Sequence, residues 1–159
     1  MNQNLDQPST DRPRPVLIKD SGGTILAMAV PKEYRPDGVE FLTPTESSLQ
    51  VGLMTRPTGE HIPAHRHLEQ ERSVFDTQEV LFIRNGKLRV HLFDKTETYV
   101  ASLDLTAGDL LHLHSGGHSF DVSEELEMIE IKQGPFIPKI DKVRFEAPDF
   151  TPKILPLSR

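Results

Sequence analysis

The chain has 159 residues and a mass of 17.9 kDa, which suits one domain that is large enough to hold a hydrophobic core. It has no cysteine, which excludes disulfides and thiolate metal sites, and its 18 Lys and Arg against 24 Asp and Glu give a net charge of −6 that argues against nucleic acid as a partner. No apolar run approaches the roughly 18 residues of a membrane span and the first residues do not resemble a signal peptide, so we expect a cytoplasmic protein without a membrane partner.

Both ends of the chain are rich in proline, which disfavours regular pairing. Residues 1–15 are predicted to form a flexible N-terminal arm, and residues 145–159 a Pro-rich C-terminal arm. Three apolar residues of the second arm could dock on the body: Phe150, Ile154 and Leu155. Residues 16–144 are predicted to form a single domain.

The domain lacks the i, i+3, i+4, i+7 spacing of an amphipathic helix and instead shows short apolar runs separated by turn residues. The predicted strands are residues 16–19, 24–30, 49–56, 78–84, 87–93, 99–105, 110–113, 119–122 and 126–133. Asn85-Gly86 between two of them predicts a hairpin, and Gly22-Gly23 and residues 107–109 are interpreted in the same way. The sequence therefore predicts an all-β sandwich or barrel.

Histidines carry the strongest chemical signal. Six of the seven lie in two windows, residues 61–67 and 112–118. His65 and His67 are two residues apart, so on a strand their side chains point to the same face and can converge on one metal ion. On a helix the same spacing would splay the two rings apart, so this interpretation depends on the β prediction.

The two windows resemble the two motifs of the cupin superfamily. In the first, five residues separate Gly59 from His65, His67 follows, and six residues separate Glu79 from Gly86. The second is similar to the stretch Gly-Asp-Leu-Leu-His-Leu-His-Ser-Gly-Gly-His, residues 108–118. The resemblance covers roughly residues 50–135 and implies a double-stranded β-helix, or jelly-roll barrel.

The resemblance also implies a metal inside one end of the barrel, held by three histidines and one glutamate: His65, His67, Glu79 and His118. The spacer between His67 and Glu79 has eleven residues, where the family usually has three or four. Glu71 fits the short spacer but not the interval to the glycine turn, so Glu79 is favoured over Glu71 and Glu69. His114 replaces the usual proline of the second motif and is interpreted as a rim residue.

This donor set suits one divalent ion of Fe, Mn, Ni, Zn or Cu, and ligand type alone does not choose between them. Open coordination positions would take water, dioxygen or an oxygen-bearing substrate, which is the basis of Lewis-acid or redox chemistry, as in a metal-dependent oxygenase or isomerase.

Weaker candidates for a substrate pocket are His112, Glu130 and Lys132. His112 is either a cavity residue or a packed strand histidine. Met128, Glu130 and Lys132 alternate with Ile129 and Ile131, which suits either a polar substrate inside a barrel or a solvated sheet face.

The leading functional hypothesis is a metal cupin that acts on a small polar molecule. Residues 129–150 resemble the tail of small cupins encoded among bacterial surface-polysaccharide genes, a match that bears on genetic context and not on chemistry. A sugar or sugar nucleotide is the substrate considered for this hypothesis. Two alternatives are a non-catalytic cupin that binds a ligand or partner and a metal-free sugar epimerase or isomerase. Enzymes of the last kind use a histidine with an acid partner, often a tyrosine. This alternative is disfavoured because the two tyrosines, Tyr34 and Tyr99, lie outside the histidine windows. Apolar strands at sheet edges favour a homodimer.

Overall fold

The computed structural model describes residues 12–137 and 140–158, so most of the predicted N-terminal arm lies outside the described residues. The described residues form strands joined by turns and irregular segments, and they contain no helix. Accordingly, no helix in this part of the chain is long and apolar enough to cross a membrane. The prediction of an all-β fold is confirmed.

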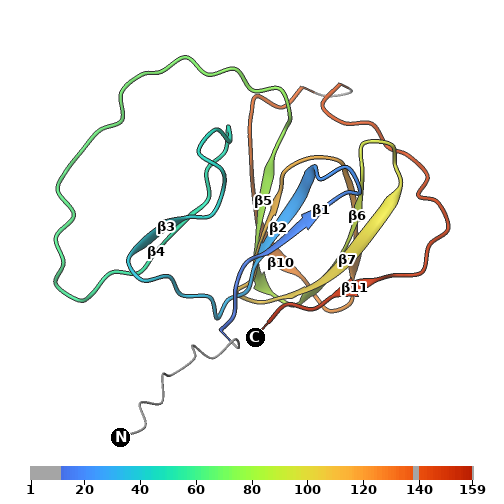
Figure 1. Cartoon of the computed structure of the whole chain (residues 1–159), viewed down its shortest axis with the longest axis horizontal. Coiled ribbons are helices and arrows are strands. Elements are labelled where there is room, and N and C mark those ends of the chain that lie inside the picture. The colour runs from blue at the N-terminus through green and yellow to red at the C-terminus, as the bar shows by residue number, and fades with distance from the viewer. Residues whose placement is uncertain (1–11, 138–139, 159) are drawn as a thin grey trace, which may run out of the picture.

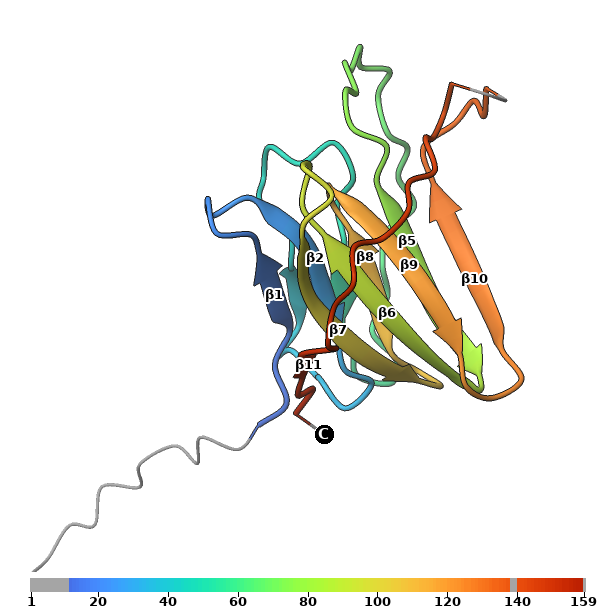
Figure 2. The ribbon, with the colours of Figure 1, turned by 90° about the vertical axis from the view of Figure 1, so that its right-hand side faces the viewer.

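Two sheets pack against each other (Figures 1 and 2). The five-stranded sheet has the order β1 (Val16–Lys19), β2 (Ile25–Val30), β8 (Leu110–Leu113), β5 (Glu79–Asn85) and β10 (Glu127–Lys132). The four-stranded sheet has the order β11 (Ile154–Leu155), β7 (Tyr99–Thr106), β6 (Lys87–Phe93) and β9 (Gly117–Val122). A separate pair consists of β3 (Val39–Phe41) and β4 (Gly52–Met54).

The core lies between the two sheets because alternate residues of each strand point inward. Its buried members include Leu26, Leu81, Ile83, Leu88, Val90, Leu92, Leu103, Leu105 and Leu111. The sheets do not close into a barrel, since β9 ends one sheet and β10 ends the other. These consecutive strands are joined by residues 123–126, so the sandwich is open along this side.

All nine predicted strands are present, with ends that differ by no more than three residues. The two strands that were not predicted are β3 and β11, which have three and two residues. Runs this short have too few positions to show a period of two, which is the signal that reveals a strand in a sequence.

Two of the three predicted hairpin turns are wrong. β5 pairs with β8 and β10, whereas β6 pairs with β7 and β9, so Asn85-Gly86 joins the two sheets instead of two paired strands. Residues 107–109 also lead from one sheet to the other, from β7 to β8. Gly22-Gly23 does join an antiparallel pair, β1 and β2. Asn-Gly favours a reversal of the chain, but it does not determine which sheet the next strand joins.

The C-terminal arm is docked on the outer face of the four-stranded sheet. β11 pairs in parallel with β7, and Leu155 packs against the core. The Phe150 ring stacks on Tyr99, with centroids 4.1 Å apart and an interplanar angle of 11°. It also meets the rings of His91 and Phe93 edge-on. The docking expected for Phe150, Ile154 and Leu155 is confirmed.

We expect Phe150→Ala to lower the free energy of unfolding by about 2 kcal/mol, because a partly buried aromatic ring and its stacking contact are lost. Glu146→Ala, an exposed position in the same arm, should change stability by less than about 0.5 kcal/mol. Urea unfolding of the two variants tests this. Equal stabilities would show that the arm contributes nothing to the fold.

Candidate functional site

Glu79 and His118 meet at one end of the sandwich, where β5 and β9 start and β10 ends; we call this the open end. Glu79 begins β5 and faces the interior, because it alternates with the core residues Leu81 and Ile83. His118 is near the start of β9 and alternates with Phe120, which packs against the core. Figure 2 shows the start of β5, the start of β9 and the end of β10 at the same end of the molecule. The His118 Nε2 atom is 3.4 Å from Glu79 Oε2.

The surroundings of His118 favour its neutral form. Burial of the imidazole lowers its pKa, an effect that Lys142 reinforces and the Glu79 and Glu130 carboxylates oppose. The side chains of His118 and Glu79 keep 30% and 19% of their exposure, so both are partly shielded from water. A neutral imidazole beside a carboxylate is a donor pair that divalent transition metals accept.

The inner face of β10 adds charged groups beside this pair. Lys132 lies directly opposite Glu79, and Glu130 directly opposite the core residue Leu81. Because residues directly opposite each other in an antiparallel ladder share a face, both side chains face the interior. Both faces of this strand are open to solvent, since the Glu130 side chain keeps 44% of its exposure and Ile129 and Ile131 on the outer face keep 44% and 54%.

Lys132 is held by several neighbours. Its Nζ lies 3.6 Å from Asp141 Oδ2 and 3.9 Å from Glu130 Oε1. It also lies 4.9 Å from the centroid of the Phe136 ring. Asp141 was not predicted as a site residue, because nothing in its local sequence indicates that the segment after β10 returns to the open end.

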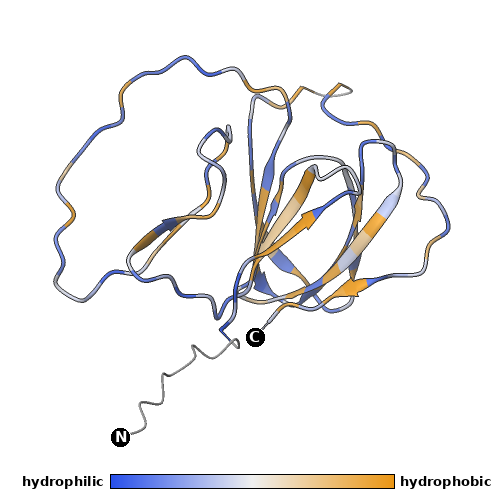
Figure 3. Cartoon of the chain, in the orientation of Figure 1, coloured by the Kyte–Doolittle hydropathy of each residue, from blue (hydrophilic) through white to orange (hydrophobic). Residues whose placement is uncertain are grey.

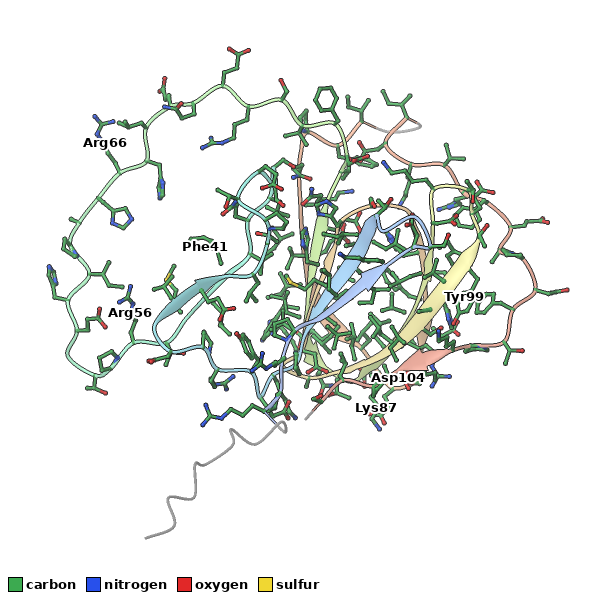
Figure 4. The ribbon with its side chains drawn as sticks, in the orientation of Figure 1. Phe41, Arg56, Arg66, Lys87, Tyr99 and Asp104 are labelled. Carbon is green, nitrogen blue, oxygen red and sulfur yellow. The ribbon has the colours of Figure 1, made fainter. Side chains whose placement is uncertain are left out.

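The structure does not bring His65 and His67 to this pair. Both lie in the segment that we call the histidine loop, residues 55–77, in which every residue is exposed. Their rings are 5.5 Å apart, and His65 Nδ1–H donates to the Pro63 carbonyl oxygen at 3.0 Å. Figure 4 shows Arg66, which stands between them in the sequence, far out on the loop. Glu69 and Glu71 lie in the same loop.

Among the described residues, no three His, Asp or Glu side chains converge in a group that could hold a metal ion. The structure thus assembles one carboxylate and one imidazole of the expected centre, namely Glu79 and His118, and leaves the other two imidazoles apart. The centre of four ligands stays a prediction.

His112 is separated from the other two predicted pocket residues. Leu111 and Leu113 belong to the core, so His112 points to the opposite, outer face of the five-stranded sheet. It is buried there, and its Nε2–H donates to Gln78 Oε1 at 2.9 Å. Burial, reinforced by His114, lowers the pKa of His112 to about 4. The interpretation that fits is a packed strand histidine.

A chain of hydrogen bonds on the four-stranded sheet was missed at the sequence level. Tyr99 Oη and His91 Nδ1 each lie 2.7 Å from Ser102 Oγ, and His91 Nε2 lies 2.9 Å from Asp121 Oδ2. Phe150 covers the group, and the side chains of Ser102 and His91 are buried. These residues are spread over three strands, so no local motif reveals them. Because Ser102 is fully buried, its hydroxyl is inaccessible to a substrate. These hydrogen bonds serve to anchor the C-terminal arm.

The fold and the site together define a class: an all-β protein of two packed sheets with a carboxylate–imidazole pair at an open end. Comparison with protein-family models, with curated proteins and with solved structures finds no match for this chain.

Proposed function

We propose that the protein is a mononuclear metal-binding cupin whose ion is held by His65, His67, Glu79 and His118, and that it acts on a small polar molecule at this site. The observation that carries the proposal is the pairing of Glu79 with His118 at 3.4 Å, because these two come from separate motifs of the sequence. Of the three glutamates considered, Glu79 is the one beside the imidazole.

The open edge of β9 offers a place for the two remaining imidazoles. Along residues 61–68 three of the four odd positions are histidines, the fourth being Pro63. The even positions hold Ile62, Ala64 and Leu68 together with Arg66, so a strand here would have one histidine face and one mostly apolar face. A strand added beside β9 would carry His65 and His67 next to His118. The loop is long enough, since the twelve steps from His67 to Glu79 span up to about 40 Å of chain.

The charge at the open end suits a cation. Three carboxylates, from Glu79, Glu130 and Asp141, face two ammonium groups, from Lys132 and Lys142, while His118 is neutral. A bound divalent ion would supply Lewis-acid polarisation of a substrate oxygen. Lys132 would donate hydrogen bonds to the oxygens of a polar ligand, and Glu130 would accept them from its hydroxyls. These groups suit a sugar or a sugar nucleotide.

Metal content tests the proposal. Protein purified without chelators should hold about one ion per chain, and His118→Ala and the double variant His65→Ala/His67→Ala should each bind it more than about 100-fold more weakly, since even loss of an outer partner of a ligand costs 10–100-fold. His61→Ala, a histidine of the same loop outside the ligand set, is the matched control and should keep the ion.

Thermal melting of each variant establishes that it is folded. A wild-type protein without metal, or equal metal in the wild type and the folded double variant, would contradict the proposal. Loss of metal in His61→Ala as well would assign the effect to the loop as a whole.

A further inference from the structure

We infer that the histidine loop of one chain completes the metal centre of a second copy, so that two chains exchange residues 55–77 and each centre takes His65 and His67 from its partner. This inference rests on the proposed function, because it concerns how the same four ligands are brought together. It adds that the centre is incomplete in a single chain.

The loop stands apart from its own body. All residues from 54 to 77 are exposed, and Figure 1 shows the segment arching away from the two sheets. Its short-range contacts are mostly internal, such as the Arg56–Glu60 ion pair at 2.6 Å. Within the described part of the chain, the loop is linked to the body by an ion pair from Lys95 Nζ to Asp76 Oδ1 at 3.4 Å and, at its start, by a hydrogen bond from Thr55 N–H to the Gly38 carbonyl oxygen at 2.6 Å. Both of its ends are fixed, because β4 pairs with β3 and β5 lies inside the five-stranded sheet.

The accessible surface of the chain is larger than that of a compact chain of the same mass. Its accessible surface is 11986 Å², whereas a monomer of this mass exposes about 8,000 Å². Even if the fourteen residues outside the described part were fully extended, they would account for only about 2,300 Å². About 1,700 Å² is left in excess, which lies in the range that each partner of an obligate dimer buries.

Some of the exposed apolar side chains lie on the histidine loop, and others form a strip on the outer face of β5 and β10. Hydrophobic residues are scattered along the loop in Figure 3, and they include Ile62, Leu68, Val74 and Phe75, the last 95% exposed. On the body, Phe82, Ile129 and Ile131 form an exposed strip on the outer face of β5 and β10. The neighbouring edge of β9 has unpaired backbone groups for a strand from another chain.

Exchange of identical segments makes the same contacts as closure within one chain, so it is a low-cost route to a dimer when the segment already projects outward. The loop projects beyond the end where Glu79, His118 and Lys132 lie (Figure 2). In a dimer with a two-fold axis, the loop of each chain would dock on the body of the other, which completes two centres at once.

The test is complementation between two inactive chains. One chain carries His65→Ala/His67→Ala, and the other carries Glu79→Gln/His118→Ala, so neither can hold the ion alone. The two are co-expressed with different affinity tags and the mixed dimer is isolated through both tags. We expect it to recover one tight site per dimer, because one centre then takes all four ligands from the intact halves of the two chains. The wild-type dimer should hold two ions.

Other outcomes are decisive against the inference. A monomeric wild-type protein with a full metal complement, or a mixed dimer without metal, would show that each chain closes on its own loop while the proposed function stands. A wild type without metal would instead remove the proposed function.

A second readout does not depend on metal. The chain has no cysteine, so Arg66→Cys in one chain and Ser119→Cys on β9 of another introduce a unique pair. Exchange predicts a disulfide between the two co-expressed chains. A disulfide that forms only in the chain carrying both substitutions would overturn the exchange. Ser21→Cys, an exposed position in the turn between β1 and β2 and away from β9, is the matched control for collisional oxidation.

Discussion

Gly86→Ala is expected to lower the free energy of unfolding by about 4 kcal/mol or to prevent folding. Gly86 has a φ of 84°, and a Cβ placed on it would lie 2.0 Å from the carbonyl oxygen of Glu125. Because that oxygen belongs to the backbone of the β9–β10 connection, it cannot move aside as a side chain would. The corner between the two sheets, and with it the register of β5 and Glu79, would have to shift.

Gly38→Ala separates the cost of a positive φ from the cost of the clash with the Glu125 carbonyl oxygen. Gly38 has nearly the same φ of 81°, but a Cβ added there would have no described atom within 4 Å beyond its chain neighbours. This variant should therefore lose only the conformational cost of a left-handed residue, about 1 kcal/mol. Chemical unfolding of both variants measures the difference, and equal losses would contradict the close approach of the two connections.

Acid should destabilise the protein through His112. Its folded-state pKa is held near 4 by burial, whereas the unfolded side chain titrates near its ordinary 6.5. Between these values the unfolded state binds more protons, so stability is complete above about pH 6.5 and falls as the pH is lowered toward 4. The difference in pKa corresponds to a loss on the order of 3 kcal/mol.

His112→Gln keeps a donor for Gln78 Oε1 but does not titrate in this range. The unfolding free energy of wild type and variant, measured at several values between pH 7 and pH 4, should therefore diverge in slope as the pH falls. Parallel curves would show that His112 is accessible to protons in the folded state.

The strands were predictable because apolar residues alternate along them, and strands such as β6 and β7 are long enough to show it. Their pairing was not. Asn85-Gly86 has the sequence of a hairpin, yet β5 and β6 find their partners elsewhere, in β8 and β9 among others. Pairing depends on which apolar faces meet across the core, and this is decided by contacts between residues far apart in the chain.

The site was likewise predictable only in part. Glu79 was preferred for its interval to Gly86, which fixes the residue's position along β5, and the structure places it beside His118. The inward direction of Glu130 and Lys132 could not be decided, because alternation gives two faces without saying which is inside. The position of the histidine loop was equally beyond the sequence, since its own alternation suits a strand that it does not form within the described chain.

The most direct test of the metal centre is the X-ray absorption spectrum of the ion bound to the wild-type protein, purified without chelators. We expect scattering from three imidazole rings and a carboxylate oxygen, with two rings lost in the folded His65→Ala/His67→Ala variant reloaded with metal. A spectrum without imidazole would show that the ion is not bound by the proposed histidines, and one that the double substitution leaves unchanged would show that His65 and His67 are not ligands; either result would contradict the proposed centre.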